Sequence, residues 1–206
     1  MKRLLSAIFA VLFVAGSLLV NGIAAEAEEK NLTAAKKAYD TDKVIVNESL
    51  DSLQSDLFEA ALNNSSDNSP CIVYIPAKTT YVVKTAKAYK KGGIEAGYTV
   101  GLYVPENVVL VGEASTVIKA GKEMKRLVMV SGSVYGGKFD GASKVSFPLS
   151  FKNGTTFEKT KSGTRQVDGN IEYVDACGAT SCCIKAISCK NIRICNNNIH
   201  DSKTRN

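Results

Sequence analysis

The chain has 206 residues, of which 45% are hydrophobic and 22% are charged, and a formal net charge of +6. Its lysines and arginines are scattered and are not interleaved with aromatic residues, which argues against a groove for nucleic acid. A mild positive balance is compatible with an anionic polymer such as a uronate polysaccharide, and equally with no charged partner at all.

Residues 1–27 have the features of a secretory signal peptide. Lys2 and Arg3 supply a positive start, residues 4–20 are almost wholly apolar, and residues 25–27 (Ala-Glu-Ala) place small side chains where a signal peptidase recognises them. The alternative is an uncleaved anchor, but the apolar run is just short of the roughly 20 residues of a spanning helix. We therefore expect a secreted or cell-surface protein that meets the membrane only during export.

Residues 28–46 are polar and rich in lysine and alanine, which predicts a linker, with a frayed first helix as the alternative. Residues 47–62 follow a helical apolar pattern, which Asn47 or Ser49 can begin. The apolar stripe of this helix is expected to consist of Leu50, Leu53, Leu57, Phe58, Ala61 and Leu62. A single helix before a series of strands is expected to cover the open end of a strand stack.

From residue 71 onward the sequence predicts short β-strands that turn residues interrupt every few positions. The strand-like segments are 71–75, 79–84, 101–120, 127–130 and 134–139. They recur at intervals on the order of 20–30 residues, as expected of stacked repeats. Residues 143–169 break this series, and we expect them to form an inserted loop or hairpin, which is either a binding face or surface decoration.

The stretch 188–201 shows the expected repeat unit most clearly. Ile192 and Ile194 alternate with polar residues, which predicts a short strand with one buried face. The asparagines at 196–198 predict a tight turn and side-chain amides that bond from one repeat to the next. Ile199 then resumes the apolar pattern. Such a unit needs a neighbour on each side to bury its apolar face.

The cysteines leave alternatives open. They are Cys71, Cys177, Cys182, Cys183, Cys189 and Cys195. An exported chain with an even number of cysteines favours disulfides, for which the outward parity of Cys195 makes it the expected partner. Small thiols buried in a narrow core are the other interpretation. Zinc is not predicted, because Cys182-Cys183 is not a CxxC pair and no second pair has the right spacing.

Residues 49–201 resemble the right-handed parallel β-helix superfamily, the pectin lyase-like proteins that include pectate lyases and polygalacturonases. The segments that carry the resemblance are 73–76 (VYIP), 107–112 (NVVLVG), 116–118 (TVI), 136–141 (GGKFDG) and 191–197 (NIRICNN). The resemblance implies an all-β fold, a right-handed parallel β-helix (β-solenoid) with an N-terminal capping α-helix over residues 47–206. Because such proteins run through more coils, we expect the chain to be an N-terminal portion.

The resemblance also implies an exported carbohydrate-active enzyme, a lyase or glycoside hydrolase that acts on acidic polysaccharide. The alternatives are a non-catalytic glycan-binding or surface structural module and an inactive truncated fragment. The Asn-Thr-Asp, Asp-Asp, Gly-His-Gly and Arg-Ile-Lys motifs of the hydrolase subgroup are missing. Candidate catalytic residues are Asp140, at a position where the family has a turn, Asp175, and His200, the single histidine beside Asp201.

No cofactor is evident from the residues. The resemblance alone implies Ca²⁺, which polysaccharide lyases on such a scaffold hold through clustered carboxylates. Asp168, Glu172 and Asp175 form a loose acidic group that could supply oxygen ligands to this ion.

Overall fold

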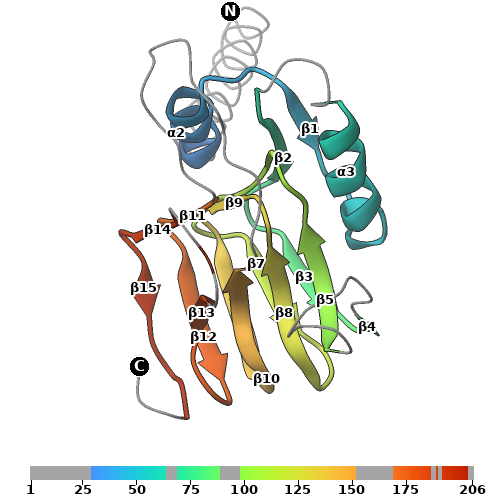
Figure 1. The fold of residues 1–206 in the computed structure, drawn as a ribbon, viewed down its shortest axis with the longest axis vertical. Coiled ribbons are helices and arrows are strands. Elements are labelled where there is room, and N and C mark those ends of the chain that lie inside the picture. The colour runs from blue at the N-terminus through green and yellow to red at the C-terminus, as the bar shows by residue number, and fades with distance from the viewer. Residues whose placement is uncertain are drawn as a thin grey trace, which may run out of the picture.

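The part of the chain that the structure describes consists mainly of parallel β-sheet, with two helices at its N-terminal side (Figure 1). The computed structural model describes residues 29–63, 69–88, 98–151, 169–186, 189 and 192–203. The expected signal peptide at 1–27 lies outside these residues. Among the helices that are described, none has the length and apolar character that a membrane span requires.

The helices are α2 (Lys30–Tyr39) and α3 (Leu50–Leu62). The strands of the first half are β1 (Val44–Val46), β2 (Cys71–Ile75), β3 (Thr80–Val83), β4 (Lys87–Ala88), β5 (Thr99–Val104), β6 (Val108–Gly112), β7 (Val117–Ala120) and β8 (Met124–Val130). Those of the second half are β9 (Ser133–Tyr135), β10 (Lys138–Phe151), β11 (Gly169–Glu172), β12 (Asp175–Ala179), β13 (Ile184–Ala186), β14 (Ile192–Cys195) and β15 (Asn198–Ile199).

These strands form two sheets. Sheet A has the order β1-β2-β6-β9-β11-β14, and the longest path through sheet B is β15-β12-β10-β8-β5-β4. Strand β7 joins β3 to the first part of β10, and β13 pairs with its last part. Among the described strands, β4 and β5 form the one antiparallel pair. The expectation of an all-β, parallel architecture is therefore confirmed.

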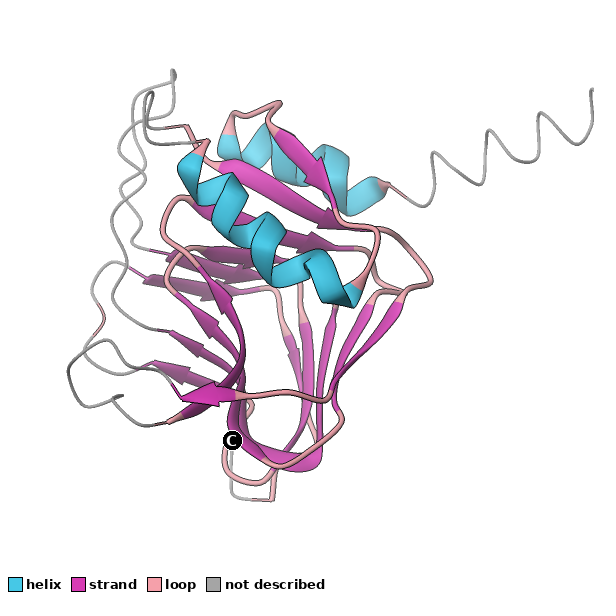
Figure 2. Ribbon diagram, turned by 90° about the vertical axis from the view of Figure 1, so that its right-hand side faces the viewer, coloured by secondary structure: helices cyan, strands magenta, loops and turns pink. Residues whose placement is uncertain are grey.

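The chain passes through the same two sheets again and again. In sheet A, Ile72 on β2 pairs with Val109 on β6, and Val109 pairs in turn with Ser133 on β9, which lies 24 positions later in the sequence. In sheet B, Lys138 pairs with Asp175, which pairs with Asn198 after a further 23 positions. The strands curl around a common interior (Figure 2), which a core of aliphatic and aromatic side chains from both sheets fills.

Helix α3 lies across one end of the strand layers (Figures 1 and 2). Ser49 is its N-cap, because the Ser49 hydroxyl accepts a hydrogen bond from the backbone N–H of Ser52. Leu53 and Leu57 are fully buried in the core, as the helical pattern predicted. The predicted stripe was too wide, however, since the side chains of Phe58 and Leu62 are exposed.

Of the two interpretations of residues 28–46, the polar linker was wrong for most of the segment and the first helix is confirmed, because the segment contains α2 and β1 (Figure 1). Strand β1 extends sheet A by pairing with β2. Helix α2 covers the outward face of sheet A with three buried side chains, Leu32, Ala35 and Tyr39. They contact Ile72, Tyr74, Val109, Val111 and Tyr135 in a second apolar cluster. Three apolar residues at helical spacing are enough to hold a lysine-rich helix on a sheet.

The predicted insertion at 143–169 does not begin where the sequence indicated. Residues 143–151 continue strand β10 and pair with β8, and they place Val145, Leu149 and Phe151 in the core. A bend at Ala142 and Ser143, both with positive φ, separates the two parts of β10. The rest of the predicted insertion, at 152–168, lies outside the described residues.

All six cysteines lie among the described residues, and all are free thiols. Cys71 and Cys183 are buried in the core, in accord with the interpretation of cysteine as a small core residue, and Cys177 is buried outside this core cluster. The disulfide alternative, including a bridge from Cys195, is not found. The described part of the repeat unit at 188–201 forms strands β14 and β15, with Asn196 in the left-handed conformation between them, but the predicted buried face was wrong for Ile194 and Ile199, whose side chains are exposed.

Candidate functional site

The candidate site is the outward face of four strands of sheet B, β7, β10, β12 and β15. Alternate residues of the first three strands, Ile118, Phe139 and Ala176, point into the core, so their neighbours point outward. We call the outward side chains the charged face; its members are Lys119, Lys138, Asp140, Asp175, Cys177, Asn198 and His200. Lys119 pairs in register with Asp140, and Asp140 with Cys177. Lys138 also pairs in register with Asp175, and Asp175 pairs in register with Asn198.

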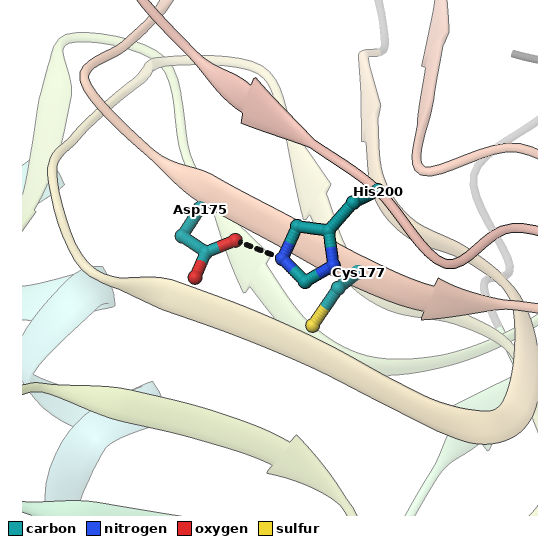
Figure 3. Close-up of side chains that lie close together, drawn as sticks. All are labelled: Asp175, Cys177 and His200. Carbon is teal, nitrogen blue, oxygen red and sulfur yellow. Dashed lines mark hydrogen bonds and ion pairs between the residues drawn. The ribbon is translucent and has the colours of Figure 1, made fainter.

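Opposite charges alternate across this face. Lys119 Nζ lies 3.3 Å from Asp140 Oδ2, and Lys138 Nζ lies 3.5 Å from Asp175 Oδ2. The second oxygen of Asp175 contacts His200 Nε2 at 2.8 Å (Figure 3). These side chains are partly exposed, so a ligand in solution can reach them and solvent screens their mutual attraction.

His200 is held between two carboxylates. Its Nδ1 lies 2.7 Å from Asp201 Oδ2, and its Nε2 faces Asp175. The hydrogen bond with Asp201, followed by that with Asp175, raises the pKa of His200 above the ordinary value of 6.5. The imidazole is therefore a proton donor over a wider pH range than a free histidine.

Cys177 and Lys138 lie beside this pair. Burial, followed by the charge of Asp140, raises the pKa of the Cys177 thiol to about 11, so the thiol keeps its proton at neutral pH. The pKa of Lys138 is also raised, first by the charge of Cys177 in its thiolate form and then by Asp175. Lys138 is accordingly a stable cation on this face and not a base at neutral pH.

The three predicted catalytic candidates all lie on the charged face. Asp175 and His200 are in direct contact, and Asp140 stands on the strand next to Asp175. Asp140 also accepts a hydrogen bond from the backbone N–H of Ala142 at 2.7 Å, which is the turn function that the sequence indicated for it. Asp140 thus has both a local structural contact and a place on this face.

The three residues that the sequence grouped for Ca²⁺ are not brought together as a site. Asp168 lies outside the described residues, and Glu172 and Asp175 belong to different sheets. Glu172 is buried on β11, where it contacts Arg193 Nε at 3.0 Å and the Cys195 thiol at 3.1 Å. Its carboxylate therefore has partners of its own, away from the charged face.

A different group of metal-binding side chains is found instead. Within the described part of the chain, one oxygen, sulfur or nitrogen atom from each of Asp175, Cys177 and His200 lies within 4.8 Å of the others (Figure 3). The sequence prediction missed Cys177. The register explains why: Cys177 and His200 are separated by 23 positions, the same offset that joins Asp175 to Asn198. Once the register of β12 and β15 is known, the offset of 23 positions identifies Cys177 as the neighbour of His200.

A scan against protein-family models finds no match for this chain, and searches of curated proteins and of solved structures find no significant match. Function is therefore inferred below from the residues and the geometry of the charged face.

Proposed function

We propose that the chain is an exported, pectin lyase-like, right-handed parallel β-helix protein that acts on acidic polysaccharide at the charged face. The observation that carries the proposal is the row of lysines, carboxylates and one histidine on four adjacent parallel strands. Because neighbouring strands lie about 4.8 Å apart, the row offers successive contacts along a line, as an extended charged polymer requires.

The arrangement of the strands supports the β-helix part of the proposal. Each strand of sheet A pairs in parallel with a strand of the preceding passage of the chain, and sheet B repeats the order. Helix α3 at one end of the layers occupies the place of the capping helix in the resemblance. The apolar start of the sequence, with small residues at 25–27, supports export.

The chemistry of the charged face supports an acidic substrate. Lys119 and Lys138 are partly exposed cations that can pair with uronate carboxylates once the ligand displaces their present partners. His200, whose pKa is raised, is the proton donor, and Asp140 or Asp175 serves as the base once the ligand displaces its lysine or histidine partner. These roles correspond to general acid–base cleavage of a glycosidic bond.

The proposal is tested by incubating the purified exported protein with polygalacturonate. Two products are followed: unsaturated uronates, which absorb in the ultraviolet and report a lyase, and new reducing ends, which report either cleavage. We expect turnover that falls at least about 100-fold in His200→Gln, the scale of a general acid. Lys122, an exposed lysine in the turn before β8, provides the matched control variant Lys122→Gln. Absence of both products under all metal and pH conditions would contradict catalysis.

A second function, glycan binding without turnover, is favoured by one specific observation. Asp140 and Asp175 are both already engaged by lysine or histidine partners, so neither is an isolated carboxylate poised as a base. This alternative predicts that the protein is retained on immobilised polygalacturonate, that Lys119→Gln together with Lys138→Gln weakens retention, and that His200→Gln does not. No retention by the wild-type protein would contradict both functions.

A further inference from the structure

We propose that Asp175, Cys177 and His200 form a binding site for a transition-metal ion of the zinc type, with an open fourth position. This site shares Asp175, Cys177 and His200 with the charged face, but metal binding does not require that the face bind polysaccharide, and no spacing of cysteine and histidine in the sequence indicated it. It arises because two neighbouring parallel strands carry the three donors: Asp175 and Cys177 on β12, and His200 directly after β15.

The geometry of the three donors fits a tetrahedral ion. Zinc bonds of about 2.0–2.3 Å place two ligand atoms about 3.5 Å apart. The carboxylate oxygen, the sulfur and the imidazole nitrogen lie within 4.8 Å of one another, so small movements of the side chains are sufficient. Asp175 Oδ1 and His200 Nε2, now 2.8 Å apart, must separate slightly to admit the ion between them.

The imidazole already has the support that a metal-bound histidine normally has. Its far nitrogen, Nδ1, lies 2.7 Å from Asp201 Oδ2, so this carboxylate can hold the Nδ1–H and direct Nε2 toward Asp175 and Cys177. A carboxylate, an imidazole and a metal in this order are typical of zinc sites, in which the outer carboxylate fixes the tautomer and the orientation of the ring.

The type of donor decides which metal is expected. A thiolate sulfur and an imidazole nitrogen suit Zn²⁺, Co²⁺ or a similar ion, whereas Ca²⁺ and Mg²⁺ require oxygen ligands. Cys177 is a buried thiol, so binding transfers its proton to solvent as the sulfur–metal bond forms. Lys138 is a cation that competes with the metal for Asp175, but it contacts Oδ2 of this carboxylate, whereas Oδ1 faces His200.

Three protein ligands leave one tetrahedral position for water or for an oxygen of a ligand. This position faces outward, because Asp175 and His200 are partly exposed members of the charged face. The ion would therefore be reachable from solution, as in a catalytic rather than a structural zinc site.

The test uses Co²⁺ and Zn²⁺ as probes on the reduced full-length protein. We expect one equivalent of Co²⁺ to produce an ultraviolet sulfur-to-metal charge-transfer band that Zn²⁺ removes. The band should be lost in Cys177→Ser and kept in the control Cys195→Ser, which alters a thiol on β14 outside the three-donor group. In a competition with a chromophoric chelator, Asp201→Asn should weaken Zn²⁺ about 10- to 100-fold, and Cys177→Ser by more.

The proposal does not depend on the folding of the variants, because His200 is the single histidine of the chain. In the wild-type protein, one equivalent of Zn²⁺ should shift the ring resonances of His200 in the NMR spectrum. Unchanged His200 resonances at saturating Zn²⁺, or a charge-transfer band that persists in Cys177→Ser, would overturn the proposal.

Discussion

The outward faces of β2 and β6 in sheet A and of β7, β10 and β12 in sheet B carry opposite chemistry, although all five are parallel strands. Strands β2 and β6 of sheet A are buried along their whole length, because the core covers one face and α2 covers the other. Strands β7 and β12 of sheet B bury mainly the inward side chains and expose several outward ones, among them Lys119 and Asp175. A strand that is apolar at every position thus indicates that both of its faces are covered. A strand in which apolar and polar residues alternate indicates that its outward face is exposed.

The difference shows where a ligand can bind. On β2 and β6 of sheet A, the outward side chains are apolar, and the carboxylate of Glu113, just after β6, holds α2 by accepting hydrogen bonds from Asn31 N and Leu32 N. On β7, β10 and β12 of sheet B, the outward side chains include four ionic and partly exposed ones, Lys119, Lys138, Asp140 and Asp175. Sheet A therefore contributes stability through its outward face, whereas sheet B is free to contribute function.

The largest effect is expected from a charge placed under α2. Val109→Asp introduces a carboxylate into the apolar cluster between α2 and sheet A, where Val109 is fully buried. We expect the free energy of unfolding to fall by about 4 kcal/mol or more, because an unpaired buried charge is among the most destabilising changes. Urea denaturation followed by circular dichroism measures it.

The matched substitution on sheet B is Val117→Asp. Val117 points outward, is only partly buried and stands in register with Lys138, which can pair with the new carboxylate. Its effect should stay within about 1 kcal/mol. Equal losses of stability in the two variants would contradict the contrast between the faces.

A smaller effect is expected from Glu113→Gln. The variant weakens the charge-assisted hydrogen bonds at the N-terminus of α2, which should reduce stability by about 1–2 kcal/mol. Hydrogen exchange should show faster exchange of the α2 amides while those of β7 and β10 are unchanged. Glu123→Gln, at an exposed position before β8, is the control. Uniformly faster exchange throughout the protein would contradict a local role.

The contribution of His200 to stability should depend on pH, and this dependence tests the charged face of sheet B. Because its folded-state pKa is raised, the stabilising contribution of the imidazolium is fully present below pH 6.5 and is lost as the pH rises through the folded-state pKa. An NMR titration of the single histidine should give a pKa above 6.5, and Asp175→Asn should lower it. A pKa at or below 6.5 in the wild-type protein would contradict the contacts with Asp175 and Asp201.

The smallest effect on stability is expected from Lys119→Met. Its ion pair with Asp140 is accessible to solvent, so the free energy of unfolding should change by no more than about 0.5 kcal/mol. Calorimetry at low and high salt measures the change. A loss of several kcal/mol would show that the charged face is needed for folding, contrary to its assignment as a functional surface.

The strand series and the covering helix α3 could be predicted because their apolar residues recur at strand and helix spacing. Helix α2 was predicted only as the alternative to a linker, since Leu32, Ala35 and Tyr39 become a buried stripe only against the face of sheet A. The alternation around Val145 indicated a strand, but not that this strand would continue β10 into the core. The burial of α2 and the extension of β10 both depend on the elements that these segments pack against, and local sequence patterns do not specify such partners.

The residues of the candidate site, like the elements of the fold, could be predicted only in part from the sequence. Asp140 and His200 could be singled out by residue type, but their common face depends on the offsets between strands. Glu172 and Asp175 are close in sequence but lie on strands of different sheets, whereas the offset of 23 positions between β12 and β15 brings Cys177 to His200. Register, rather than composition, determines which side chains meet.

The most direct test of the functional contrast is lysine footprinting with and without polygalacturonate. Exposed lysines are acetylated in solution, and their modification is quantified by mass spectrometry. If sheet B binds the polymer, Lys119 and Lys138 should become protected, while Lys36 and Lys37 on α2 and Lys122 should react as before. Protection of the α2 lysines, with Lys119 and Lys138 unchanged, would contradict the assignment of the charged face.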